Sequence, residues 1–192
     1  MNRRFSTIAA PTLGLLLLVT AVPLTQGCET FDLQWTPIED TVALYSLARP
    51  EYVDLPSAFD FYSRRLVIVE EPKVGDPADF DVALSEEGGE FVFLPAGLFA
   101  TFEINPGIAA IDSAGVTFDN LAFAPEDGYV TDAPVVLELG VVYAVRTRRD
   151  RGGCSRYAKF EILDMDPAGM VEFRQIRNNL CNDRELIPPD EG

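Results

Sequence analysis

The chain has 192 residues, of which 31 are acidic and 15 are basic, and its formal net charge at pH 7 is −16. This charge argues against binding to nucleic acid, because the phosphates would be repelled. The sequence contains no histidine, which excludes Ser-His-Asp and Cys-His catalysis as well as histidine-based zinc sites. The hydrophobic content of 47% is that of a globular protein and not of a disordered acidic chain.

The N-terminus predicts export and attachment to a lipid. Two arginines precede an apolar run over residues 13–22, which has about the length of a signal-peptide core. The run leads into Leu24-Thr25-Gln26-Gly27-Cys28. This segment resembles the lipobox of bacterial lipoproteins, although Thr25 and Gln26 depart from the usual pattern. The resemblance implies a lipid on Cys28; the alternative is an ordinary secretory signal with an unrelated cysteine nearby.

These features divide the chain into four parts. We expect a signal peptide over residues 1–27, a tether over 28–35, a β-rich domain over 36–177, and a C-terminal tail over 178–192 that is held by Cys181. The signal contains two arginines and no acid, so the 165 residues after it carry a formal charge of −18. The expected location is the cell envelope, where the lipid binds the membrane and the domain faces the periplasm or the exterior.

The first element of the domain has two interpretations. Thr36-Pro37-Ile38-Glu39 is typical of a helix N-terminus, with a capping box and Pro at the first helical position, and would start a short helix over residues 40–48. Residues 42–45 are equally typical of a buried strand. Both alternatives remain open at this point.

Short apolar segments separated by Gly and Pro predict strands through the rest of the chain. Residues 66–69 predict a buried strand, and in residues 80–85 the alternation predicts an apolar face and a mostly polar face that includes Asp81. Glu87-Gly88-Gly89 predicts a hairpin turn. Further strands are expected at 91–94, 107–112, 116–118, 135–147 (strongest at 141–145), 157–164 and 170–177. This pattern predicts an all-β fold, a single β-sandwich-like domain of short antiparallel strands.

The last two strands predict a disulfide. Asp166-Pro167-Ala168-Gly169 is typical of a type I turn. A hairpin closed there would pair Ile162 with Phe173, and Met165 with Met170, in a register that also places Cys154 opposite Cys181. In an oxidising compartment we expect these two cysteines to be bonded, with two reduced thiols as the alternative. A bulge at Gly169 would shift the register by one residue.

Several of these strands resemble a known family. Residues 143–147, 157–162 and 171–173, together with 79–83, resemble strands of HmuY-type haem-binding lipoproteins, which carry a similar Tyr-x-Lys element near the end. The resemblance implies a secreted, lipid-anchored, β-rich domain. It does not imply haem binding here, because the histidines that hold the iron in the best-known members have no counterpart. We therefore expect no cofactor.

Charged clusters supply the candidate sites. A basic island is a candidate anion-binding site, and its interpretation as intramolecular pairing with nearby acids is the favoured one; it comprises Arg146, Arg148, Arg149, Arg151 and Arg156. Alternation places Arg146 and Arg148 on one side of a strand. Two acidic groups, Asp76/Asp79/Asp81 and Asp164/Asp166/Glu172, contain ligands of the type calcium prefers but do not match a calcium-binding loop. We expect no metal site.

No catalytic motif is present, and we expect a non-enzymatic binding or structural module. Its partner would be a small ligand or another envelope protein, besides the membrane that the lipid contacts. The alternative function is a carboxylate-based hydrolase acting on envelope or extracellular polymers. Such an enzyme needs a cleft that holds two acids at a set separation.

Overall fold

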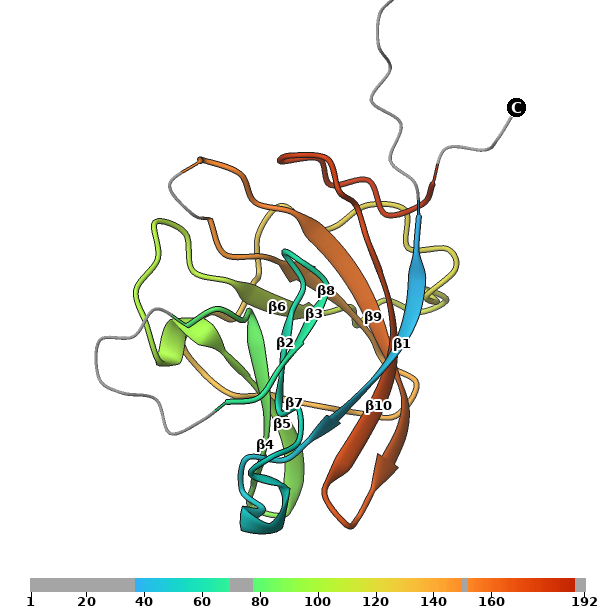
Figure 1. Ribbon diagram of the computed structural model, residues 1–192. Helices are drawn as coiled ribbons and strands as arrows, with labels where there is room; N and C mark the ends of the chain where they lie inside the picture. Colours follow the sequence, from blue (N-terminus) through green and yellow to red (C-terminus); the bar gives the residue numbers. More distant parts are fainter. Residues whose placement is uncertain (1–36, 70–77, 150–151, 189–192) are drawn as a thin grey trace, which may run out of the picture. The chain divides into compact units, whose positions relative to one another are not determined.

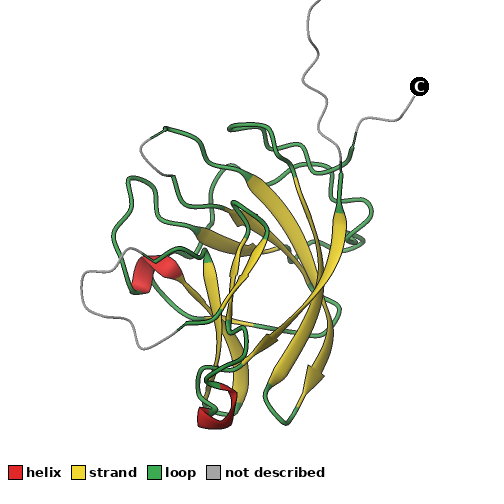
Figure 2. Ribbon diagram, in the orientation of Figure 1, coloured by secondary structure: helices red, strands yellow, loops and turns green. Residues whose placement is uncertain are grey.

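The computed structural model describes residues 37–69, 78–149 and 152–188. The predicted signal peptide, the tether, Cys28, Asp76 and Arg151 lie outside the described residues. Within these parts, the strands form two antiparallel five-stranded sheets and the helical structure is limited to two short turns (Figure 2). The predicted all-β, sandwich-like fold is confirmed.

The first sheet has the strand order β1-β10-β9-β8-β6 and the second has the order β3-β2-β4-β5-β7 (Figure 1). The strands of the first sheet are β1 (Glu39–Tyr45), β10 (Met170–Arg177), β9 (Tyr157–Asp166), β8 (Val142–Arg146) and β6 (Gly107–Ala110). Those of the second sheet are β3 (Arg65–Val67), β2 (Ala58–Asp60), β4 (Val82–Glu87), β5 (Glu90–Pro95) and β7 (Val135–Val136). The two 3-10 turns are η1 (Pro50–Tyr52) and η2 (Ala96–Leu98).

Aromatic side chains fill the space between the two sheets. Tyr143 and Phe160 of the first sheet stack with their ring centroids 4.8 Å apart, and Phe93 of the second sheet lies 5.4 Å from Phe160. The buried hydroxyl of Tyr143 donates to the carbonyl of Val136 at 3.1 Å and accepts the amide of Glu138 at 2.9 Å, so its polar end is satisfied. Period-two alternation along each strand directs these rings inward.

The first element is a strand, so its interpretation as a helix is wrong. β1 pairs along its whole length with β10, from Glu39 opposite Ile176 to Tyr45 opposite Met170 (Figure 1). Val42 and Leu44 alternate into the core. Pairing with a strand from the other end of the chain and burial of these two side chains outweigh the local capping signals.

The β9–β10 hairpin follows the predicted register in the part that lies away from the turn. Gly169 donates its amide to the carbonyl of Asp166 at 2.8 Å, as expected for the turn, and Ile162 pairs with Phe173. The predicted pair of Met165 with Met170 is wrong, because Met165 lies opposite Val171. The register shifts by one between Glu172 and Phe173, because Leu163 of β9 has no partner in β10.

Three local predictions are corrected by the structure. Residues 66–69 are not a buried strand: β3 lies at the edge of its sheet, and Leu66 and Ile68 are 47% and 49% exposed. Residues 116–118 lie in a loop instead of a strand. Asp81 is fully buried, because β2 and β4 are covered on that face as well. The hairpin at Gly88-Gly89 is confirmed, with Glu87 opposite Glu90.

A smaller hydrophobic cluster covers the outer face of the first sheet. Ile176 of β10 and Val142 of β8 point outward and pack with Phe118 and Leu121 of the preceding loop and with Leu186. The amide of Leu186 donates to Ala122 O at 2.7 Å. The described part of the C-terminal segment is therefore packed against the domain, and this second layer builds the walls of a pocket.

Candidate functional site

An open pocket of about 330 Å³ lies on the outer face of the first sheet. Its apolar walls come from the loop after β6 and from the two ends of the described domain; they comprise Pro37, Phe118, Ile176, Leu186, Ile187 and Pro188. Three charged residues also line it, Lys159, Glu39 and Asp119. A volume of this size suits a small molecule.

Lys159 is the unusual member of this pocket. Alternation along β9 places Phe160 inside the sandwich and Lys159 on the outer face, where the covering loop leaves it only 3% exposed. Its Nζ donates to the carbonyl of Leu121 at 3.1 Å and lies 5.0 Å from the centroid of the Phe118 ring. Burial lowers the pKa of Lys159 to about 8, although the negative charge of Asp119 opposes this shift.

The two acids of the pocket are engaged by another cation. Nη1 of Arg174 lies 3.6 Å from a carboxylate oxygen of Glu39 and 3.6 Å from one of Asp119, and its Nε donates to Glu161 at 2.7 Å. The guanidinium also covers the Phe118 ring at 4.2 Å. Among the residues that the structure describes, no carboxylate lies within 4.0 Å of Nζ of Lys159.

A second polar group, here called the ion cluster, consists of Asp60, Asp81 and Arg148. Nη1 of Arg148 lies 2.8 Å from Asp60 and 3.2 Å from Asp81, and its main-chain amide donates to Asp81 at 2.9 Å. Both carboxylates also accept the amide of Tyr62. Since the acids come from the second sheet and Arg148 follows β8 of the first, the ion cluster joins the two sheets.

The two buried carboxyls differ in their pKa. Burial raises the pKa of Asp81 to about 6, against the attraction of Arg148. Burial also opposes the ionisation of Asp60, but the hydrogen bonds from Arg148 and Ser63 outweigh it and lower the pKa of Asp60. Both carboxyls are buried and the Arg148 side chain is only 14% exposed, so we expect the ion cluster to stabilise the fold and not to contact a substrate.

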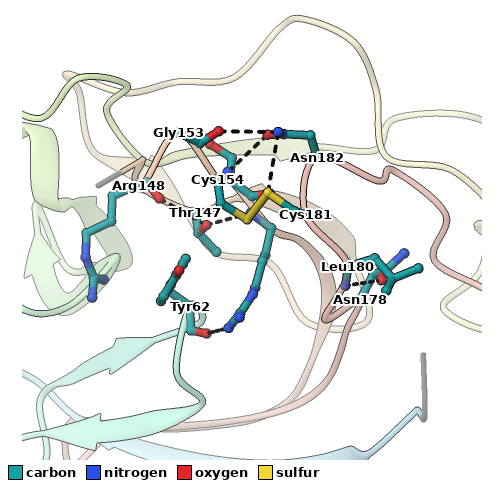
Figure 3. The surroundings of a disulfide bond; sticks show 11 residues. Tyr62, Thr147, Arg148, Gly153, Cys154, Asn178, Leu180, Cys181 and Asn182 are labelled. Atoms are coloured by element: carbon teal, nitrogen blue, oxygen red, sulfur yellow. Dashed lines mark hydrogen bonds between the residues drawn. A yellow bond between two sulfur atoms is a disulfide. The ribbon is translucent and has the colours of Figure 1, made fainter. Parts of the chain in front are cut away.

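Cys154 and Cys181 form the predicted disulfide, with their Cα atoms 5.2 Å apart (Figure 3). The ladder of β9 and β10 continues toward the disulfide by one further pair, since the amide of Asn178 donates to Tyr157 O at 2.9 Å. Next to the bond, Asn182 Oδ1 accepts the amide of Ser155 at 3.1 Å and its Nδ2 donates to Gly153 O at 3.3 Å. The disulfide thus joins the segment before β9 to the segment after β10.

The arginines of the basic island do not form one site. Arg146 packs over the ring of Tyr129 at 4.9 Å, whereas Arg148 is in the ion cluster and Arg149 lies 3.8 Å from Glu103. The expectation that Arg146 and Arg148 share one side of a strand is wrong, because β8 ends at Arg146 and the chain then turns toward Asp81.

Arg156 belongs to a different group. Its guanidinium covers the ring of Tyr62 at 4.3 Å and donates to the carbonyl of the same residue. This places Arg156 at the end of the sandwich that also holds the disulfide, where Tyr62, Thr147 and Arg148 lie (Figure 3).

Three members of the two acidic groups have other partners. Asp79 pairs with Arg65 at 2.7 Å and Asp81 is in the ion cluster. Asp166 accepts the amide of Ala168 at 2.8 Å within the hairpin turn. In residues 37–69, 78–149 and 152–188, no group of three or more potential metal ligands is assembled.

Sequence reasoning missed the burial of Lys159 and of the two aspartates. A signal existed for the aspartates, since Asp60 stands between Phe59 and Phe61 and Asp81 follows Phe80. An acid flanked by apolar residues at a strand end is expected to be buried if both faces of the sheet are covered. No such signal marked Lys159, because the loop that buries it lies about 40 residues earlier in the chain.

Comparison of the chain with protein-family models, curated protein sequences and solved structures finds no match in any of the three. The described part of the chain also has no helix that is long and apolar enough to cross a membrane.

Proposed function

We propose that this protein is an exported, lipid-anchored binding module whose outer-face pocket binds a small, largely apolar molecule that ends in a carboxylate. The observation that carries the proposal is the position of Lys159. It lines a pocket of about 330 Å³, it is almost completely buried, and it makes no ion pair with any carboxylate of the described residues.

The chemistry of Lys159 favours a carboxylate. An ammonium group has three N–H donors, and among the described residues only Leu121 accepts one. A buried charge is costly unless it is paired and hydrogen-bonded. A carboxylate within the pocket would supply both, and Phe118, Ile176 and Leu186 would contact an attached hydrocarbon group.

Lipid attachment would occur at Cys28, after removal of residues 1–27. The disulfide between Cys154 and Cys181 supports a location outside the cytosol, because such bonds persist in oxidising compartments. In this arrangement the lipid holds the protein at the membrane and the domain binds its ligand in the periplasm or outside the cell.

The alternative, a carboxylate-based hydrolase, has weaker support. Glu39 and Asp119 line the same pocket and share Arg174, which satisfies the need for two neighbouring acids. However, their side chains are 51% and 79% exposed. A general acid that works at neutral pH needs apolar surroundings that favour its protonated form.

The binding test uses the small number of lysines in this chain. Lys73 and Lys159 are the only two, so in the full chain carrying K73R an isotope-labelled lysine side chain reports on Lys159 alone. Titration with octanoate is expected to shift the Lys159 NMR signal in a saturable way and to raise its pKa above about 8. 1-Octanol should act more weakly and octylamine should have no effect, since neither provides a carboxylate.

The control variants separate the pocket from non-specific binding. K159M is expected to abolish the octanoate binding heat measured by calorimetry, whereas K73M should retain it. If octanoate, octanol and octylamine shift the Lys159 signal equally, or if K159M binds octanoate as well as the wild type, the proposal is wrong.

Anchoring is tested separately by growing cells with labelled palmitate. The wild type should take up the label and Cys28→Ser should not, whereas Cys181→Ser should still be labelled. Label in Cys28→Ser, or none in the wild type, would contradict the anchor while leaving the pocket proposal intact.

A further inference from the structure

Three guanidinium groups come together at the end of the sandwich next to the disulfide. They belong to Arg64, Arg156 and Arg177, here called the arginine trio. Nη1 of Arg156 and Nη1 of Arg177 both donate to the carbonyl oxygen of Tyr62, and Arg177 also donates to Phe61 O at 3.3 Å. Two like charges thus share one acceptor. Burial lowers the pKa of Arg177 to about 10, and the charges of Arg156 and Arg64 add to this shift.

Strand alternation explains why the trio is there. Phe173 of β10 points into the core, so Arg177, four residues later, points the same way at the end of the strand. In β9 the same alternation relates Phe160 to Arg156, which directly precedes the strand. At this end of the sandwich, arginine side chains take the place that aromatic side chains occupy in the core.

The nearby carboxylates already have partners. Asp60 and Asp81 pair with Arg148, and Asp40 pairs with Arg64. In the part of the chain that the structure describes, no carboxylate lies within 4.0 Å of the guanidinium of Arg156 or of Arg177. Counting Arg148, and Arg65 with its partner Asp79, five guanidiniums face four carboxylates, which leaves an excess of positive charge on an otherwise acidic protein.

Unused donors accompany this excess charge. The Nε atoms of Arg64, Arg156 and Arg177 are all buried and have no hydrogen-bond partner among the described residues. A buried donor without an acceptor is costly, and more so when it carries charge. Nε and the adjacent Nη form the fork with which a guanidinium binds an oxyanion in bidentate fashion.

We propose that the arginine trio is a binding site for a phosphate-like oxyanion. An oxyanion placed beside Arg156 and Arg177 would neutralise their repulsion and would accept hydrogen bonds from donors that the protein leaves unused. This site is separate from the pocket at Lys159, which lies on the outer face of the first sheet, whereas the trio lies between the sheets. The disulfide stabilises it, because Cys154 precedes Arg156 by two residues and Cys181 follows Arg177 by four.

The first test observes the donors directly in the wild-type full chain. Arginine labelled with 15N gives separate Nε–Hε signals, and inorganic phosphate is added while chloride is adjusted to keep the ionic strength constant. The signals of Arg156 and Arg177 should shift in a saturable way, and the melting temperature should rise with phosphate. If neither the signals nor the melting temperature respond beyond the chloride control, the trio is not an anion site.

The second test compares charge-removing variants. R156Q and R177Q are expected to weaken phosphate binding at least tenfold, whereas R49Q removes the same charge from the pair of Arg49 with Glu86 and should leave binding unchanged. Equal binding by R156Q, R177Q and the wild type would overturn the proposal. If the first two variants do not fold, the NMR test on the wild type still decides.

The source of the oxyanion is distinguished by vesicles, with Cys28→Ser protein to avoid the lipid. Sedimentation with phosphatidylglycerol vesicles in excess of that with phosphatidylcholine vesicles, reversed by inorganic phosphate, would identify a lipid headgroup. Phosphate binding without this excess would identify a free anion. Both results support the arginine trio, and a failure of both leaves the test of the Lys159 pocket unaffected.

Discussion

Arg148 and Asp60 connect the two sheets of the sandwich across 88 residues of sequence, with Nη1 of Arg148 2.8 Å from Oδ1 of Asp60. Asp60 is the last residue of β2, and Arg148 lies two residues beyond β8. Asp81, the residue before β4, completes the ion cluster. These three charges occupy the end of an otherwise aromatic core, so their pairing controls how the sheets meet there.

Removing the positive charge of Arg148 is expected to lower the stability of the folded protein. R148M leaves the carboxylates of Asp60 and Asp81 buried without their partner and should lower the free energy of unfolding by about 3 to 5 kcal/mol. The matched control is R149M, since Arg149 makes a longer contact with the exposed Glu103 and its loss should cost less than about 1 kcal/mol. Urea unfolding measures both, and similar losses would contradict the role of Arg148.

The pKa of Asp81 predicts the direction in which the stability of the protein changes with pH. Its pKa is about 6 in the folded protein and about 4 in an unfolded chain, so the folded state holds the proton more tightly. The stability that this carboxyl contributes is therefore present below pH 4 and is lost as the pH rises to 6, on the order of 3 kcal/mol. Carbon-13 NMR of labelled aspartate, assigned with D81N, should show a midpoint near 6. A midpoint at or below 4 would contradict this expectation.

The pKa of Lys159 predicts that stability changes with pH in the opposite direction at alkaline pH. Its pKa is about 8 in the folded protein and about 10.4 when unfolded, so the unfolded chain binds more protons between these values. Stability should rise from pH 8 to 10.5 by an amount on the order of 3 kcal/mol. The comparison is the difference in free energy of unfolding between the wild type and K159M, with K73M as the control. A constant difference across this range would show that Lys159 is not desolvated.

The disulfide between Cys154 and Cys181 closes a loop with a sequence separation of 27 residues. Its reduction should lower the free energy of unfolding by about 3 kcal/mol, mainly because the unfolded chain gains freedom. The double variant C154S/C181S should show the same loss and no response to reductant. A wild type equally stable with and without reductant would contradict the expectation.

Truncation of Leu186 tests whether the C-terminal segment belongs to the domain. It is fully buried against Phe118 and Ile176, so L186A should cost about 2 to 5 kcal/mol. I38A is the control, since Ile38 is exposed and its truncation should cost less than about 0.5 kcal/mol. Equal effects would mean that the segment after β10 is only a tail.

Local sequence patterns were sufficient for much of the fold. Alternation predicted the β-rich domain, and the Asp166–Gly169 turn predicted a register that brings Cys154 and Cys181 together. A hairpin depends on residues that are close in the sequence, so its turn and its alternation carry the necessary information. The same local signals were misleading at Pro37, where partner strand β10 decided that β1 is not a helix.

The candidate sites were decided by tertiary structure alone. Whether Lys159 is a solvated surface charge or a buried amine depends on a loop around Leu121 that covers β9. Likewise, Arg156 and Arg177 become neighbours only because two strand ends meet the Tyr62 turn of the other sheet. Alternation tells which side of a strand a residue occupies, but burial and charge pairing depend on what covers that side, and here the covering segments are distant in the chain.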